Sequence, residues 1–389
     1  LVGALIGAFS GGFFSDRYGR KFTLFITSFL FIVGTFFLSF ADGISMLIVG
    51  RFFSGLAIGI ASVIVPLYIS EMSPAEYRGG LVSLNQLAIT IGILISLIID
   101  YSFADDAQWR KMFGMSFIPA IAYFFGLIFI PETPSFLASK GKQKKALKIL
   151  EKIHRRKTFD EVVDEPRRHE ADKTSSWGYL FSKAMRPALI VGVGISILQQ
   201  ITGINIVFYY APRIFQLAGF ESASAAILAS MGVGIVNVFI TIIALWLIDL
   251  VGRRPLLIAG VIGMSVSLVL LGGVFLMKNE HLGLVAMIAL MLYVAFFAFS
   301  LGPIAWLIIS EIYPLGIRGR AMGFASFVNW SSNYIVSVTF LSLVHFFGPA
   351  GTFWLYAAIG VIGLWFIFKM VPETKGKTLE QIQNYWKKG

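Results

Sequence analysis

Residues 70–79 read SEMSPAEYRG, and residues 310–319, 240 positions further on, read SEIYPLGIRG. Both stretches keep a Ser-Glu pair, a proline three residues after the glutamate and a closing Arg-Gly pair. Self-similarity of this kind is typical of a chain built from two homologous halves. The repeat therefore predicts that the two halves form the same set of elements.

Two shorter repeats support the same division. DRYGRK at 16–21 and DLVGRR at 249–254 share an acid, a glycine and a basic pair at the same spacing. PET at 131–133 recurs at 372–374. The three pairs of motifs occur in one order and at nearly one offset, so duplication explains them better than chance.

Apolar runs fill most of the chain between these motifs. The sequence is 57% hydrophobic and 14% charged, with 37 Phe among its 389 residues. A run of ~20 apolar residues can cross the ~30 Å hydrocarbon core of a bilayer. The composition therefore predicts an all-α polytopic membrane protein. We expect ten full spans and one shortened span over residues 1–14, the full ones being 22–40, 46–68, 80–99, 112–130, 187–212, 224–248, 255–277, 283–309, 320–344 and 350–371.

The two halves differ in the number of spans. The second half has six, and the acidic motif at Asp249 follows the second of them, whereas Asp16 follows the first of five. The chain also begins with Leu1 rather than Met. We therefore expect eleven spans of a twelve-helix protein, with the first helix absent. The expected domains are a first half (helices 2–6), a cytoplasmic linker with short helices, a second half (helices 7–12) and a cytoplasmic tail, at 1–131, 132–186, 187–372 and 373–389.

Within the expected linker, residues 142–157 have the pattern of an amphipathic basic helix. Residues 158–176 are rich in charges of both signs and are predicted to be loosely structured.

Positive charge gathers in alternate loops. The chain carries 32 Lys and Arg against 21 Asp and Glu, a net charge of +11, and most basic residues lie at 131–187, after Lys369 and in the short loops on that side. This positive-inside bias predicts that the linker and the C-terminus are cytoplasmic in a multi-pass protein of the cell (inner or plasma) membrane. It accounts for the charge without a nucleic-acid partner. With no Cys and four scattered His, the sequence predicts no metal site and no cofactor.

The apolar run that begins near Ala188 contains a cluster of uncharged polar residues. Residues 198–212 read LQQITGINIVFYYAP. An amide without a partner in hydrocarbon costs roughly 2–7 kcal/mol, so these groups should face protein, water or a ligand. Donors, acceptors and aromatic faces without net charge suit a neutral, hydroxyl-rich solute. On an ideal helix Gln200 and Asn205 lie about 140° apart. Either the helix unwinds near Gly203, or the two amides serve different partners.

These motifs together resemble the sugar porter family of the major facilitator superfamily, which includes bacterial xylose– and galactose–proton symporters and facilitative glucose transporters. The resemblance covers the whole chain. Its motifs are Asp16-Arg17-x-Gly19-Arg20-Lys21, Gly50-Arg51, Glu71 with Arg78-Gly79, Pro131-Glu132-Thr133-Pro134, Gln199-Gln200-x-x-Gly203-x-Asn205, Tyr209-Tyr210-x-Pro212, Gly302-Pro303-x-x-Trp306, Asn329-Trp330 and Pro372-Glu373-Thr374. It implies a major facilitator fold that works by alternating access, as a monomer and without catalytic residues.

The resemblance also implies the binding residues. Amides and an indole that would hydrogen-bond sugar hydroxyls lie at Gln86, Gln199, Gln200, Asn205, Asn237, Trp306 and Asn329, and rings that would line the cavity lie at Tyr209, Phe297 and Trp330. The alternative is polar contacts between helices, worth ~0.6 kcal/mol each on average. Gly203 and Gly302-Pro303 interrupt their spans, as helix breaks that line a cavity or as packing kinks.

The charged motifs are predicted to close the cytoplasmic mouth by bridging the halves, the alternative being simple anchoring at the interface. Exposed pairs contribute only ~0–1 kcal/mol each, which suits contacts that must break thermally. The expected gate consists of Asp16, Arg17, Arg20, Glu71, Arg78, Glu132, Asp249, Arg253, Arg254, Glu311, Arg318 and Glu373.

Arg51 is the candidate for proton coupling, because a charge inside a span needs a partner. The resemblance implies that an Asp on the first helix would supply it. We expect secondary transport by proton symport, with facilitative uniport as the alternative that the residues present leave open. The substrate stays open as well, because Ile93 and Asn329 depart from a xylose symporter and Ala298 departs from glucose carriers. A hexose or pentose is expected, with inositol transport or a non-transporting sugar receptor as alternatives. No nucleophile–base pair suggests an enzyme.

Overall fold

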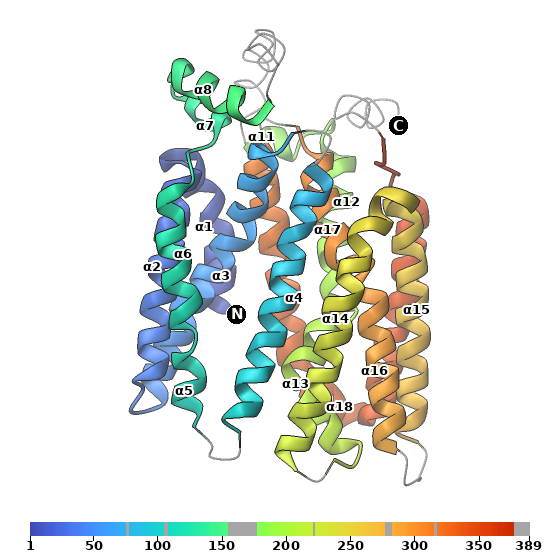
Figure 1. Ribbon diagram of the computed structural model, residues 1–389. Helices are drawn as coiled ribbons and strands as arrows, with labels where there is room; N and C mark the ends of the chain where they lie inside the picture. The colour runs from blue at the N-terminus through green and yellow to red at the C-terminus, as the bar shows by residue number, and fades with distance from the viewer. Residues whose placement is uncertain are drawn as a thin grey trace.

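The computed structural model is a bundle of helices that run nearly along one direction (Figure 1). It describes residues 1–74, 78–104, 108–154, 177–220, 222–276, 282–314 and 317–376. The predicted loose stretch at 158–176 and most of the predicted tail lie outside these residues. The prediction of an all-α fold is confirmed.

The first half contains six helices that make five crossings. Leu-, Ile- and Phe-rich surfaces of these helices face outward, because no water is present at this depth to penalise them. The fifth crossing is divided into α5 and α6 at Met115 and Ser116. The helices are α1 (Val2–Tyr18), α2 (Arg20–Ser39), α3 (Ile44–Met72), α4 (Arg78–Ser102), α5 (Trp109–Gly114) and α6 (Phe117–Phe129).

Three short helices follow at one end of the bundle, at the top of Figure 1. They are α7 (Pro134–Ser139), α8 (Gln143–His154) and α11 (Trp177–Leu180). The helix α8 occupies the described part of the predicted basic amphipathic helix, and Ala146 and Leu150 on its apolar side are buried. We call this end of the bundle the basic end, since the basic loops gather there.

The second half contains six crossings. Two of them are each formed by two helices in succession, and the last two are joined in α18. The helices are α12 (Arg186–Ile201), α13 (Ile204–Leu217), α14 (Ala223–Val251), α15 (Arg253–Val274), α16 (Leu282–Ala298), α17 (Leu301–Ile312) and α18 (Arg318–Met370).

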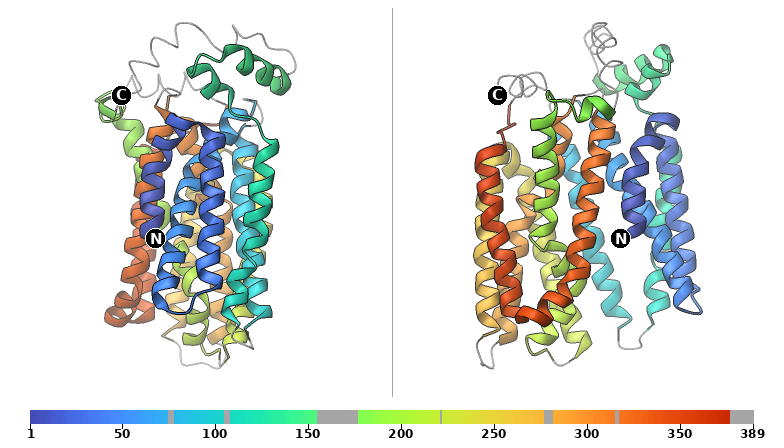
Figure 2. Two further views of the ribbon diagram at one scale, coloured as in Figure 1. Left: turned by 90° about the vertical axis from the view of Figure 1, so that its left-hand side faces the viewer. Right: turned by 180° about the vertical axis from the view of Figure 1, so that it is seen from behind.

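Eleven crossings follow from the described residues. Nine helical segments are long and apolar enough to span a bilayer. One of these, α18, has 53 residues and leaves the helical conformation at Gly348, just before Pro349. Figure 2 shows it turning back there, at the end opposite the basic end, so it crosses twice. The second crossing of α18 brings the number of crossings to ten. The helix α1, with 17 residues, adds one more and makes eleven. The predicted number of spans agrees with the structure.

The halves meet chiefly along two pairs of helices. The helix α1 lies against α18 on one side, and α4 lies against α14 on the other. Small residues permit close packing within the first half as well: a Cβ on Gly7 would lie 2.2 Å from the carbonyl oxygen of Leu56 in α3. Such contacts supply van der Waals energy where lipid provides no hydrophobic drive for association.

The repeated motifs form the same structure twice at the basic end. Gly19 and Gly252 precede α2 and α15 with φ of 101° and 106°, a conformation that favours glycine. Glu132 accepts hydrogen bonds from the backbone N–H groups of Arg20 and Lys21, at 3.0 and 3.2 Å. In the second half, the N–H groups of Arg253 and Arg254 donate to Glu373, at 3.1 and 3.0 Å. Each carboxylate thus satisfies the free N–H groups at a helix start.

The arginine after each glycine holds two more acids. Arg20 lies 3.5 Å from Asp16 and 2.9 Å from Glu71. Arg253 lies 3.3 Å from Asp249 and 3.4 Å from Glu311. Thr374 donates to Glu311 at 2.7 Å, so the PET motif closes the second network. All these described ion pairs lie within one half, so they differ from the predicted bridges between halves.

Glu373 should stabilise the fold in a pH-dependent way. Burial opposes its ionisation, but the N–H groups of Lys375, Arg254, Arg253 and Thr374 outweigh burial and lower the pKa of its carboxyl. Its stabilisation is therefore complete above the ordinary glutamate pKa of ~4.3 and is lost as pH falls through the lower folded pKa.

We expect Glu373→Gln to lower the melting temperature at pH 7 by about 2–4 °C, the usual effect of ~1 kcal/mol in a domain of moderate size. Thermal unfolding of the purified protein between pH 7 and pH 3 would show the difference from wild type shrinking only at the acid end. Glu151→Gln, on the exposed side of α8, is the control and should change little. A deficit that stays constant down to pH 3 would contradict the charged cap.

Candidate functional site

Two broken helices meet in the interior of the second half. The crossing formed by α12 and α13 breaks at Thr202 and Gly203, where Gly203 has φ of +93° in the left-handed region. The crossing formed by α16 and α17 breaks at Phe299 and Ser300. Non-helical backbone at membrane depth requires protein or water around it, because lipid offers no hydrogen bonds. The predicted unwinding near Gly203 is therefore present.

Four of the predicted amides form one hydrogen-bonded network beside these breaks. Gln199 donates from Nε2 to the carbonyl oxygens of Leu301 and Gly302, at 2.9 and 3.3 Å. Gln200 Nε2 donates to Asn329 Oδ1 at 3.1 Å, and Asn329 Nδ2 donates to Gln199 Oε1 at 2.8 Å.

Asn205, from the far side of the break, donates to Gln200 Oε1 and completes the network. The break thus lets two amides that an ideal helix would separate by about 140° meet. Gln199, Gln200 and Asn329 are buried, whereas Asn205 is half-buried. No member is charged, so the network offers only neutral donors and acceptors.

Two further predicted residues lie beside the network at Gly302. A Cβ on Gly302 would lie 3.5 Å from Gln86 Nε2 and 3.2 Å from the ring of Phe297. Gln86 belongs to α4 of the first half, so residues of both halves converge here. Among the described residues, no hydrogen bond joins Trp306 or the side chain of Asn237 to the network. Asn237 is buried, and its Oδ1 has no hydrogen-bond partner there.

Trp330 and Tyr209 have partners outside the amide network. Trp330 donates from Nε1 to Ser62 Oγ at 3.1 Å, a hydrogen bond between α18 and α3 that crosses from one half to the other. The Tyr209 hydroxyl accepts from Asn333 Nδ2 at 3.4 Å, and Ser337 Oγ donates to Asn333 Oδ1 at 3.0 Å. The structure brings these rings to the borders of the site.

Asn333 was not among the predicted site residues. It is buried and lies one helical turn after Asn329, on the same side of α18. The four-residue spacing was the available signal, since two amides on one face of a membrane helix are costly unless both find partners.

Arg51, the candidate for proton coupling, lies near the start of α3. Its side chain is exposed, with the guanidinium 4.9 Å from the centre of the Phe113 ring. No carboxylate among the described residues forms an ion pair with it. The predicted coupling role therefore stays a prediction.

The halves touch at the basic end through small residues. A Cβ on Gly12 would lie 3.1 Å from the carbonyl oxygen of Gly319, and a Cβ on Gly319 would lie 3.2 Å from Asp16 Oδ1. Phe9 and Phe327 also pack edge to face across this contact, 5.6 Å apart. The helices α1 and α18 thus contribute to the contact between halves at this end.

Three more of the predicted gate residues have described contacts within their own half. Arg318 Nε donates to the carbonyl of Tyr313 at 3.3 Å, and Arg254 donates to the carbonyl of Phe368. Arg17 lies over the ring of Tyr18, 5.5 Å from its centre. Arg78 begins α4, but its side chain lies outside the described residues.

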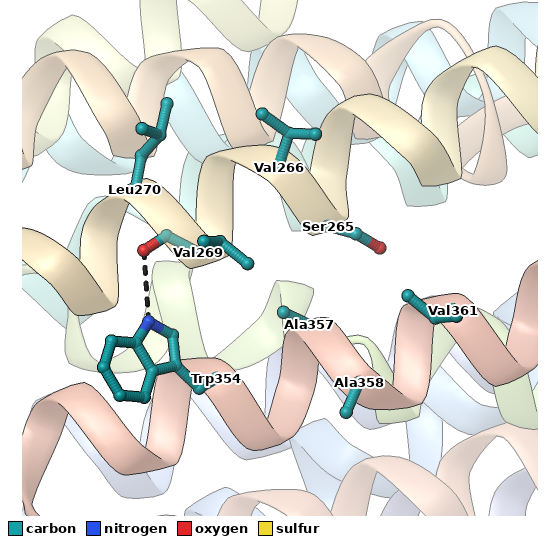
Figure 3. Close-up of a pocket in the computed structure, with 8 residues that line it drawn as sticks. All are labelled: Ser265, Val266, Val269, Leu270, Trp354, Ala357, Ala358 and Val361. Carbon is teal, nitrogen blue, oxygen red and sulfur yellow. Dashed lines mark hydrogen bonds between the residues drawn. The ribbon is translucent and has the colours of Figure 1, made fainter.

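A groove on the outside of the bundle is separate from this site. It runs between α15 and α18, and Figure 3 shows Trp354 at one end donating to the carbonyl of Val269, at 3.2 Å. Val266 and Val361 on its walls are more than half exposed. The groove is apolar and faces the lipid side, and none of the predicted binding residues lines it.

Comparisons with known proteins agree with this arrangement. The family described as "Sugar (and other) transporter" matches residues 1–386. A probable metabolite transport protein of Bacillus subtilis is 40% identical, over all of this chain and 85% of the relative. The D-xylose-proton symporter of Escherichia coli K12 is 36% identical, over 99% of this chain and 84% of the relative.

A solved structure of the proton:xylose symporter XylE with 6-bromo-6-deoxy-D-glucose has a TM-score of 0.87 and 35% identity, covering 99% of this chain and 87% of that one. The inward-open conformation of the E. coli xylose transporter XylE has a TM-score of 0.74 at 33% identity, over 99% and 87% of the two chains.

The two helical halves and the polar centre between them define a transporter of the major facilitator superfamily. Within that class, the chain belongs to the Sugar (and other) transporter family. The resemblance inferred from the motifs is confirmed, and so is the expectation that the protein is not an enzyme.

Bulk at Gly12 should separate the halves at the basic end. A valine cannot fit against Gly319 while α1 and α18 keep their contact, so we expect Gly12→Val to favour forms open at this end. Spin labels on Cys at Ser139 and Ala184, both exposed there, would report a longer distance. The 389-residue sequence contains no cysteine that would interfere.

Gly126→Val is the matched control, because the space around Gly126 is open. It should leave the distance distribution unchanged. The same distribution in Gly12→Val and wild type would show that this contact does not hold the end closed.

Proposed function

We propose that the protein imports a monosaccharide, a hexose or pentose, by proton symport and alternating access in the cell membrane, with the basic end in the cytoplasm. The observation that carries the proposal is the uncharged amide network of Gln199, Gln200, Asn205 and Asn329 at the two helix breaks. Gln86 approaches the same place from the other half.

The chemistry of the network suits a sugar. Each amide has donors and acceptors, as each hydroxyl has, so a sugar can replace one amide partner by another without leaving a buried group unpaired. The ring of Phe297, beside Gly302, would cover the sugar's C–H groups. A charged solute would have no counter-ion among these four amides.

The contacts at the basic end favour a form closed to the cytoplasm. Gly12 packs on Gly319 at that end, and Trp330 is tied to Ser62 across the halves several helical turns deeper. The lower TM-score with an inward-open structure points the same way. We infer that breaking these contacts opens the site to the cytoplasm, while the ion pairs of Arg20 and Arg253 keep each half rigid.

Proton coupling is favoured by the similarity to a D-xylose-proton symporter and by Arg51, a cation within a span. Facilitated diffusion of a sugar or of a polyol such as inositol is the second candidate. A non-transporting receptor on the same fold is the third, and an uptake measurement separates it from both.

Uptake by proteoliposomes tests the function directly. We expect labelled D-xylose or D-glucose to accumulate when the lumen is alkaline relative to the outside, and only to equilibrate without a pH gradient. Equal, non-concentrative uptake with and without the gradient would establish the uniporter instead. No uptake of any sugar or polyol would reject transport.

Gln200→Ala and Asn205→Ala test the site. Each removes a network partner and leaves a buried amide unpaired, so we expect the Kd for the transported sugar to rise about 10–100-fold. Gln216→Ala is the matched control, because Gln216 is an exposed amide of α13 that contacts Arg213. Wild-type affinity in both test variants would place the sugar elsewhere.

A further inference from the structure

The carbonyl of Thr202 loses its helical partner at the first break. In an uninterrupted helix the N–H of Ile206 would donate to it, but this N–H donates to Gly203 instead, at 3.1 Å. The hydroxyl of Tyr293, on α16, donates to the Thr202 carbonyl at 2.8 Å. Tyr293 is fully buried, so the bond lies away from water and lipid. It satisfies a backbone group that would otherwise be left unpaired.

The opposite connection runs from α12 to the second break. Gln199, three residues before Thr202, donates to the carbonyls of Leu301 and Gly302 in the first turn of α17. The helix before one break thus holds the start of the helix after the other. Tyr293 on α16 completes the pair by holding the end of α12.

We propose that Tyr293 is a positioning residue of the sugar site: with Gln199 it braces the two helix breaks against each other, so that they move as one unit. This rests on the proposed function, because the amides that the brace positions, Gln200 and Asn205, flank the break at Gly203. Tyr293 itself does not touch the sugar.

The surroundings of the break favour one geometry. Gly203 holds a φ that other residues rarely adopt, and its nearest non-local neighbour is the ring of Tyr356, 3.5 Å from where a Cβ would stand. A methyl group at position 203 would therefore meet no steric clash, but an alanine there would be strained by the positive φ. Without the Tyr293 hydroxyl, the Thr202 carbonyl can regain a donor only if α12 and α13 shift relative to each other. Such a shift would separate Gln200 from Asn205.

The test compares Tyr293→Phe with Tyr313→Phe in the full chain. Both tyrosines are fully buried, but the Tyr313 hydroxyl has no hydrogen-bond partner among the described residues. Two quantities are measured: hydrogen exchange of the peptide that spans residues 198–210, and the Kd for labelled D-xylose and D-glucose.

We expect Tyr293→Phe to speed exchange at 202–206 and to raise the Kd about tenfold, a change of ~1.4 kcal/mol. Tyr313→Phe should change neither. Unchanged exchange in Tyr293→Phe would overturn the brace. Faster exchange with an unchanged Kd, or an equal rise in both variants, would overturn the positioning role. If wild type binds neither sugar, the proposed function fails for them and exchange alone decides the brace.

Gly203→Ala keeps the inference testable if Tyr293→Phe does not fold. Its methyl group has room, so it acts through φ alone. We expect the same rise in Kd, and less than additive effects when both changes are combined, because they act on one break. Wild-type affinity in Gly203→Ala would show that the geometry of the break does not set sugar binding.

Discussion

Backbone groups in a membrane must find their hydrogen-bond partners inside the protein, and the rest of this structure depends on that constraint. Where α12 ends within its span, the Tyr293 hydroxyl gives the Thr202 carbonyl the donor that the helix no longer supplies. Gln199 adds a contact from α12 to the carbonyls in the first turn of α17. The same polar groups then create a place where a neutral polar solute could be held. Because a helix break needs polar side chains around it, the same requirement that makes the break costly also gathers the polar groups of the candidate site.

The repeat at the basic end obeys the same rule with charges in place of amides. Glu132 and Glu373 satisfy the N–H groups at the starts of α2 and α15, and Arg20 and Arg253 each gather two acids. These networks lie within single halves, while the halves meet through Gly12 and Gly319. Motion between halves then costs a few packing contacts and leaves the ion pairs intact. This explains why strongly charged motifs can accompany a moving interface.

The sequence allowed the fold to be predicted almost completely. Repeated motifs indicate two homologous halves, and apolar runs of ~20 residues match the thickness of the bilayer core. Four of the amides could also be placed, since an amide in a span must have a partner. What could not be predicted is which partner each group takes. The predicted bridges between Arg20 or Arg253 and the opposite half are pairs within a half. Asn333 and Tyr293 could not be predicted, because their hydrogen bonds join residues of helices that are far apart in the sequence.

A neutral network also explains how a site can be both buried and reversible. A buried ion left alone costs several kcal/mol, so a charged site would hold its ligand or its counter-ion tightly. The amides of Gln199, Gln200, Asn205 and Asn329 instead form hydrogen bonds with one another. A hydroxyl that enters exchanges one hydrogen bond for another of similar strength, and the net gain comes from few extra contacts. Modest affinity on both sides of the membrane is what a carrier needs, since a solute that is bound must also be released. If the two breaks brace each other as proposed, an exchange of partners in the network would act on the backbone at both breaks, which is the link that the proposed alternating access requires.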